Sequence, residues 1–326
     1  MQNSTVFSRQ LAMDISHSSL LDEFKKATLQ LRLHELEAQS LNILFAGPQG
    51  VGKTATIKAL FGDDLVGDAL SEQTASNSLE VSRYEKGGLV VWDYPGHTGH
   101  AEQDALLDMQ LGATLTECDG DGTPLIDMVV VVLDAAERNL NSGYRLICEV
   151  IVPALGDQFD SRLVVGLNKV DAASYGYEWD FAMDTPSPEV EIWPESTASL
   201  LRHCMLDESG LEIAPVCYAA EFARKDDIAR PFNLLKLVNE MVSKLPIEKK
   251  LMVFDAPLNN KTMAWHESDD RINYLVQMEN NLFDLIYEGA KDGARFGGLL
   301  GAYLGKQGRE LGYLVRRNVR RTLHQE

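Results

Sequence analysis

The sequence predicts a doubly wound, mostly parallel α/β sheet with an N-terminal helix and a helical C-terminal extension. Three observations support this fold class. Apolar runs such as "MVVVVL" and "RLVVGL" are continuous, as expected of strands buried on both faces of a sheet. These runs alternate with segments of helical length, which indicates right-handed crossovers. A glycine-rich stretch, "GPQGVGKT", directly follows the first apolar run, "LNILFA".

Strands and helices are expected to alternate through a central domain, residues 41–245. We expect strands near residues 41–46, 79–85, 88–93, 127–133, 162–167 and 213–218. We expect helices near residues 53–61, 100–117, 141–155, 190–206 and 231–245. The acidic, aromatic stretch at 173–193 is expected to be a covering loop before a helix, with a partner surface as the alternative.

Two further segments flank this domain. Residues 1–40 are expected to form a helical arm, in which residues 19–40 have the apolar periodicity of one amphipathic helix. This helix either packs on the central domain or binds a partner. Residues 246–326 are expected to form a helical, glycine-rich, basic C-terminal extension.

The stretch "GPQGVGKT" fits the pattern Gly-x-x-x-x-Gly-Lys-[Ser/Thr] between a strand and a helix. Its glycines allow several backbone N–H groups to point at a phosphate chain, and the helix amino end adds partial positive charge. Lys53 is expected to reach the β- and γ-phosphates and Thr54 to ligate Mg²⁺. The expected nucleotide-binding residues here are Gly47, Pro48, Gln49, Gly50, Val51, Gly52, Lys53, Thr54 and Ala55.

Two later stretches narrow the choice of nucleotide. "LVVWDYPGH" ends a strand in Asp93-x-x-Gly96, where the carboxylate is placed to hold Mg²⁺ through water and the Gly96 amide to approach the γ-phosphate. "RLVVGLNKVDAA" ends a strand in Asn168-Lys169-x-Asp171. An aspartate accepts two hydrogen bonds from the guanine N1–H and amino group, whereas adenine offers no matching pair of donors. We therefore expect strong discrimination in favour of guanine.

The order and spacing of these three stretches resemble the P-loop GTPases of the translation-factor-related class, in particular the Era-like branch that includes 50S ribosome-binding GTPases. The resemblance covers residues 41–245. It implies GTP and GDP as ligands and Mg²⁺ as cofactor, held by Thr54, Asp93 and a first-switch threonine. "SEQTASNS" offers Thr74 for that role, with Ser71 and Ser76 as alternatives. The last base-contacting loop of the family usually contains Ser-Ala; here the corresponding residues are Ala219 and Ala220.

Hydrolysis of GTP requires a group that orients the attacking water. His97 directly follows Gly96 and matches the histidine of translation elongation factors, so we expect His97 and Lys53 to be catalytic; the alternative is that His97 is an ordinary switch residue. No arginine lies between Lys58 and Arg83, and Gly50 stands where some relatives have a potassium-binding asparagine. Intrinsic turnover is therefore expected to be slow, on the order of 10⁻⁴ to 10⁻² s⁻¹.

Composition limits the partners and the compartment. The net charge of −19 argues against a protein whose main surface binds DNA or RNA. The four cysteines form no Cys-x-x-Cys pair and the histidines no ligand set, so we expect reduced thiols and no zinc. The chain has neither an apolar signal region nor an apolar run of spanning length. We expect a cytoplasmic protein, with peripheral contact at the inner face of the membrane as an open alternative.

The C-terminal extension has glycine at 289, 293, 297, 301 and 305, every fourth residue. On a helix these glycines form one stripe that allows close helix packing, and the basic residues after it favour an anionic surface. Self-association, peripheral membrane contact and packing on the chain's own domain remain open.

We expect a slow GTPase that acts as a nucleotide-dependent switch on a protein or membrane-associated partner. The alternatives are a ribosome-associated assembly GTPase, which the acidity disfavours, and a GTP-binding scaffold without turnover.

Overall fold

The computed structural model describes most of the central domain and the N-terminal arm. The described residues are 6–19, 21–37, 39–62, 65, 81–137, 139–173, 179–180, 185–186, 188–221, 231–245, 249–250, 274, 276–278 and 317. Thr74 and the glycine series at 289–305 lie outside the described residues, so the expectations about them stay predictions.

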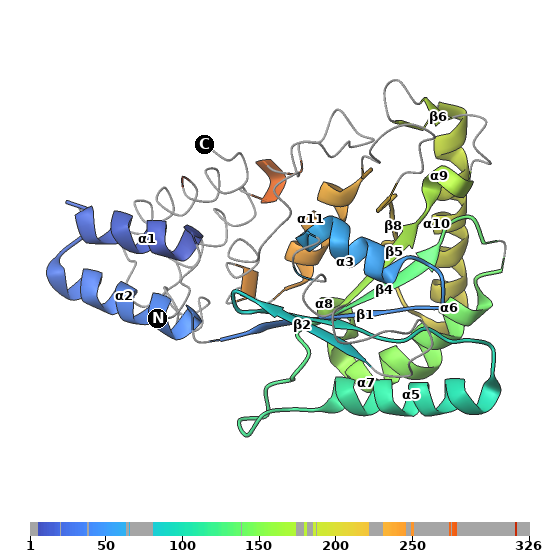
Figure 1. Ribbon diagram of the computed structural model, residues 1–326, viewed down its shortest axis with the longest axis horizontal. Coiled ribbons are helices and arrows are strands. Elements are labelled where there is room, and N and C mark those ends of the chain that lie inside the picture. Colours follow the sequence, from blue (N-terminus) through green and yellow to red (C-terminus); the bar gives the residue numbers. More distant parts are fainter. Residues whose placement is uncertain are drawn as a thin grey trace.

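Six strands form one sheet in the order β2-β3-β1-β4-β5-β8 (Figure 1). Only β2 runs antiparallel to its neighbour; the other pairs are parallel. The predicted doubly wound, mostly parallel fold class is therefore confirmed. The strands span Leu41–Ala46 (β1), Ser82–Lys86 (β2), Leu89–Asp93 (β3), Met128–Asp134 (β4), Leu163–Asn168 (β5) and Val216–Cys217 (β8).

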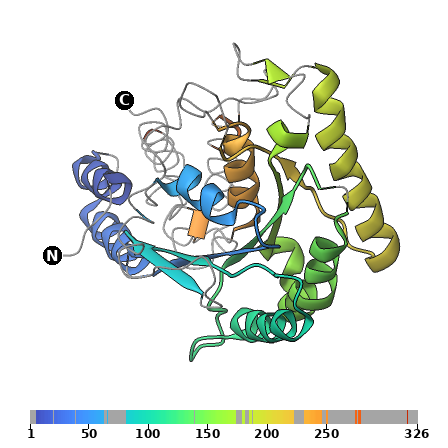
Figure 2. The same cartoon turned by 45° about the vertical axis from the view of Figure 1, so that its right-hand side comes forward.

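Helices cover both faces of the sheet (Figure 2). α3 (Lys53–Phe61) and α11 (Leu234–Lys244) pack on one face, and α5 (Ala101–Thr116) and α10 (Pro188–Ser209) pack on the other. Alternate residues of each strand point to opposite faces, so that Val130 lies in one core and Val131 in the other. Both faces are apolar because both are covered, which explains the continuous apolar runs.

The predicted helix at 141–155 is a series of shorter turns. α6 (Asn141–Arg145) leads into a π-helix (Leu146–Ile151, η1), then α7 (Val152–Leu155), a 3₁₀ turn (Gly156–Gln158) and α8 (Phe159–Arg162). Pro153 lacks the amide that would continue the α-helical hydrogen-bond ladder, so an uninterrupted α-helix is not available here.

The expected covering loop at 173–193 contains more regular structure than the sequence indicates. α9 (Val170–Ala173) is followed by a pair of two-residue strands, β6 (Trp179–Asp180) and β7 (Thr185–Pro186). α10 then begins at Pro188, two residues before the predicted start, because proline suits the first helical turn.

The N-terminal arm consists of two helices and not one. α1 (Val6–His17) and α2 (Glu23–Glu37) lie side by side at the amino end of β1 and bury leucines such as Leu11, Leu29 and Leu33 (Figure 1). The chain turns at residues 18–22, where two serines favour a helix end over a helix interior. Within the described ranges, no helix is long and apolar enough to cross a membrane.

The start of the C-terminal extension contacts the central domain. Lys249 Nζ lies 3.4 Å from Asp127 Oδ2 and donates to the carbonyl of Ser40. Asp127 also accepts a hydrogen bond from the Asn42 amide at the amino end of β1. Residue 317 lies near α1, since Arg317 pairs with Asp14.

Candidate functional site

The glycine-rich loop joins β1 to α3 at the carboxyl edge of the sheet. Gly52 caps α3 with a φ of 94°, a left-handed conformation, and a Cβ at this position would overlap the Asn168 amide nitrogen. Only glycine avoids both the strain and the overlap. The loop therefore fixes where Lys53 and Thr54, the first two residues of α3, leave the helix.

Lys53 is a buried cation. The residue is 8% exposed, and its Nζ donates hydrogen bonds to the carbonyls of Gly47 and Pro48, each at 2.9 Å. Burial lowers the pKa of Lys53 to about 8, and attraction by Asp93 opposes this only in part. A bound phosphate would supply the negative charge that stabilises this ammonium group.

Thr54 and Asp93 come from different elements and meet beside Lys53. Thr54 Oγ1 donates to Asp93 Oδ2 at 2.5 Å. Burial raises the pKa of Asp93, while the Thr54 hydrogen bond and Lys53 lower it. A hydroxyl and a carboxylate are the hard oxygen ligands that Mg²⁺ takes, and this ion usually keeps waters and substrate phosphates as its other ligands. The described residues hold no cluster of three or more histidine, cysteine or acidic side chains that would form a complete protein cage. The pair Thr54 and Asp93 fits Mg²⁺ bound together with a nucleotide.

The loop after β3 packs directly on the glycine-rich loop at residues 47–54, the predicted phosphate loop. The Gln49 amide donates to the carbonyl of His97 at 3.2 Å, and a Cβ at Gly96 would overlap the backbone of Pro48 and Gln49. Glycine at 96 is therefore required for the close approach. Asp104 in the first turn of α5 accepts from the amides of Thr98 and Gly99, which ties this loop to α5.

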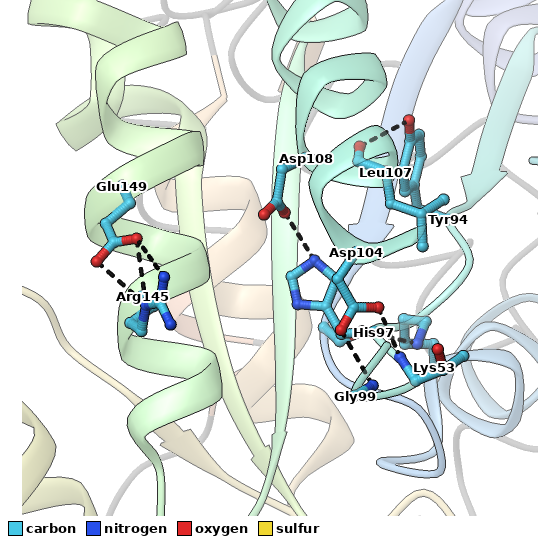
Figure 3. A network of polar contacts seen from close by, with 11 residues as sticks. Lys53, Tyr94, His97, Gly99, Asp104, Leu107, Asp108, Arg145 and Glu149 are labelled. Atoms are coloured by element: carbon cyan, nitrogen blue, oxygen red, sulfur yellow. Dashed lines mark hydrogen bonds and ion pairs between the residues drawn. The ribbon is translucent and has the colours of Figure 1, made fainter. Parts of the chain in front are cut away.

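The His97 side chain points to α5 (Figure 3). Its Nε2 lies 2.7 Å from Asp108 Oδ1. An ionised carboxylate only accepts hydrogen bonds, so Nε2 carries the proton and, in neutral His97, Nδ1 is the acceptor. Asp108 thus fixes the tautomer that could accept a hydrogen bond from water. Sequence reasoning missed Asp108, because its helical position gives no signal of this contact.

Asn168 connects three loops. Its Nδ2 donates to the Val51 carbonyl of the phosphate loop at 2.9 Å, and its Oδ1 accepts from the Ala220 amide at 3.0 Å. The Ala219 amide donates to Phe232. Both alanine amides thus donate within the protein, and a direct contact of either with a base would have to share that hydrogen bond.

Lys169 and Asp171 complete the predicted base site. Lys169 has a φ of 64°, unusual for a non-glycine residue, and its Nζ lies 2.7 Å from Asp134 Oδ2. Burial raises the pKa of Asp171, opposed by hydrogen bonds from backbone amides. Donors on a bound base would stabilise the ionised carboxylate. Sequence reasoning missed Asp134, although a carboxylate at the end of the neighbouring strand β4 was a usable signal.

Comparisons with known proteins give structural matches only. No family model and no curated protein matches the sequence. Translation elongation factor SelB from Methanococcus maripaludis, solved with the GTP analogue GPPNHP, matches with a TM-score of 0.36 and 14% identity. That match covers 63% of this chain and 34% of the SelB chain, so this chain spans about a third of SelB.

Two further structures extend the range of similar proteins. Toc33 from Arabidopsis thaliana, solved with Mg²⁺ and GMPPNP, has a TM-score of 0.40 at 14% identity over 74% of this chain and 96% of its own. The bacterial dynamin GTPase LeoA from ETEC has a TM-score of 0.43 at 14% identity over 89% of this chain and 50% of its own. These matches transfer no activity, ligand or partner to this chain. The similar structures come from several kinds of GTPase and do not single out the Era-like branch.

Proposed function

We propose that this protein is a guanine-nucleotide switch that binds GTP with Mg²⁺ and hydrolyses it slowly. The observation that carries the proposal is the joint placement of the three sequence motifs at one edge of the sheet. Lys53, Thr54 and Asp93 form a cationic, oxygen-rich end suited to phosphates. Asn168 connects that end to the segment that holds Lys169 and Asp171.

The proposed roles follow from the chemistry of each group. Lys53 would neutralise the β- and γ-phosphates, and Thr54 and Asp93 would hold Mg²⁺, which supplies further charge neutralisation when bound. Asp171 would accept from the guanine N1–H and amino group, while Lys169 lies against the base. His97, oriented by Asp108, would accept a hydrogen bond from the attacking water through Nδ1.

The slow rate is proposed because the first arginine after α3 makes other contacts. Arg83, the first arginine after α3, lies on β2 with its guanidinium 5.3 Å from the centre of the Trp92 ring and pairs with Glu85. Such an engaged side chain is not placed to act as an arginine finger. A partner or a second copy would have to bring the missing charge, which suits a regulated switch.

The base assignment is tested with Asp171→Asn. The amide presents a donor where the carboxylate accepted, so GTP affinity should fall by at least about tenfold while xanthosine nucleotide affinity rises. Fluorescence titration with labelled GDP, GTP and xanthosine diphosphate measures both changes. Asp157→Asn, an exposed aspartate in the 3₁₀ turn, is the matched control. Unchanged GTP affinity in Asp171→Asn would remove the guanine assignment.

A further inference from the structure

A cavity of about 450 Å³ lies between the segment that follows β4 and the long helix α10. Residues 135–137 and 139–141, Tyr144 of α6 and Ala173 of α9 form one side. The other side is a single face of α10, with Thr197, Leu200, Leu201, Cys204 and Glu208. These positions are spaced by three and four residues, so one stripe of α10 faces the cavity over a length of about 16 Å.

The lining is apolar with acidic groups and no basic ones among the described residues. Its apolar lining residues include Leu140, Leu200, Leu201 and three alanines. Glu137 lies three residues after the carboxyl end of β4, and Glu208 lies on α10, so each side of the cavity carries one carboxylate. Carboxylates on both sides of an apolar groove favour an occupant that carries basic residues beside an apolar stretch.

Leu200 is an exposed apolar residue of this groove. It is 60% exposed, although the neighbouring Leu201 is 3% exposed. Burying such a side chain against an apolar partner would release water from its surface and stabilise the contact. The wall opposite α10 leads into the π-helix η1, and π-helical turns occur frequently at functional sites.

We propose that this groove docks an amphipathic α-helix of a partner protein, with apolar anchor side chains in the cavity and lysine or arginine beside them. Apolar anchors spaced at i, i+3 or i+4 and i+7 match the stripe on α10. The net charge of −19 adds a general preference for basic partners. The carboxylates of Glu137 and Glu208 would repel a helix with acidic flanks.

The same groove is connected to the proposed base site by backbone hydrogen bonds. The Ala135 amide donates to the Asn168 carbonyl at 2.8 Å, and the Ala136 amide donates to Asp134 Oδ1 at 2.9 Å. On the same side of the cavity, the Ala173 amide donates to the Lys169 carbonyl at 3.1 Å. A helix that moves this side would move Asp134, Asn168 and Lys169, so docking should change the rate of nucleotide release. This second part rests on the proposed function, whereas docking itself does not.

Docking is tested with two synthetic peptides of about 16 residues that share leucines at i, i+4 and i+7. One carries lysines at both ends and the other glutamates. Binding to the nucleotide-free full chain is followed by fluorescence anisotropy. Leu200→Asp and Glu208→Lys change the groove; Leu206→Asp and Asp207→Lys change α10 residues that do not line the cavity and serve as matched controls. Leu206 is 51% exposed, so both leucine variants should fold.

We expect the lysine-flanked peptide to bind, and each groove variant to weaken binding at least tenfold while each control stays within twofold. Equal weakening by Asp207→Lys would mean unspecific charge attraction and would overturn the proposal, as would equal binding of the glutamate-flanked peptide or no binding of either. A wild-type chain that self-associates, and that Leu200→Asp renders monomeric in sedimentation, would place a second copy in the groove instead. Peptide binding without any change in labelled GDP release would overturn the coupling alone.

Discussion

If nucleotide binds as proposed, the buried ammonium group of Lys53 should make its affinity depend on pH. Its pKa of about 8 lies well below the usual value for lysine, because burial penalises the charged form. A bound phosphate chain favours the charged form. Nucleotide binding above pH 8 therefore requires proton uptake by Lys53, and the affinity should fall as the pH rises.

The size of the effect follows from this pKa. Charged Lys53 makes up about nine tenths of the nucleotide-free protein at pH 7 and about one tenth at pH 9, given a pKa of about 8. GDP affinity should fall about tenfold over that range, or about 1.4 kcal/mol. Titration calorimetry at pH 8, in two buffers with different ionisation enthalpies, should show uptake of about half a proton.

Lys53→Arg separates this effect from titration of the base or of Asp171. Arginine stays charged throughout the range, so its weaker GDP binding should lose the part of the pH dependence that Lys53 causes. If wild type and Lys53→Arg show the same pH dependence between pH 7 and 9, Lys53 is not the titrating group. The account of a buried cation that awaits a phosphate would then be refuted.

Three further predictions concern hydrolysis, base binding and the domain boundary. His97→Ala should keep GTP affinity within about twofold and lower single-turnover hydrolysis at least tenfold, whereas His100→Ala in the same loop should leave both the affinity and the rate unchanged. Asp134→Asn removes the partly exposed ion pair with Lys169 and should weaken GDP binding two- to fivefold, or on the order of 0.5–1 kcal/mol. Fluorescence titration measures this affinity, and an unchanged value would mean that Asp134 has no role in holding Lys169. Truncation after residue 246 removes Lys249 and should lower the free energy of unfolding in urea by about 1.5–3 kcal/mol relative to truncation after residue 250, because Asp127 loses its contact with Lys249 and keeps Arg162 and the Asn42 amide. Equal midpoints would contradict this.

The central sheet could be predicted from the sequence because each strand carries its own signal. Strands buried on both faces need apolar residues at every position, and β4 and β5 have them. The phosphate loop is equally local, since its glycines, lysine and threonine are contiguous and β1 and α3 have the predicted bounds. Short-range patterns therefore sufficed for the fold class and for the placement of the three motifs.

The parts that the sequence did not predict depend on contacts between distant segments. The pairing of His97 with Asp108 and that of Lys169 with Asp134 join residues from different elements. No local pattern encodes which residues pair, although the position of Asp134 at the end of β4 was a usable signal. The break between α1 and α2 and the π-helix have a similar cause. The sequence shows only apolar periodicity and one proline there, while packing on the rest of the chain selects the geometry.

The contacts of Asn168 indicate a different role for this residue from the one that the sequence predicts. Both polar atoms of the Asn168 side chain are engaged within the protein, one with Val51 and the other with Ala220. If the proposed function holds, Asn168 would act as a framework between the predicted phosphate loop and the predicted base-binding loops, and Asp171 would be the side chain that reads the base. Because the Asn168 amide group contacts both loops, a nucleotide that orders the phosphate loop would also order the segment of Lys169 and Asp171. Base and phosphates should thus be bound cooperatively, and a base-side perturbation such as Asp134→Asn should weaken the hold on the phosphates as well.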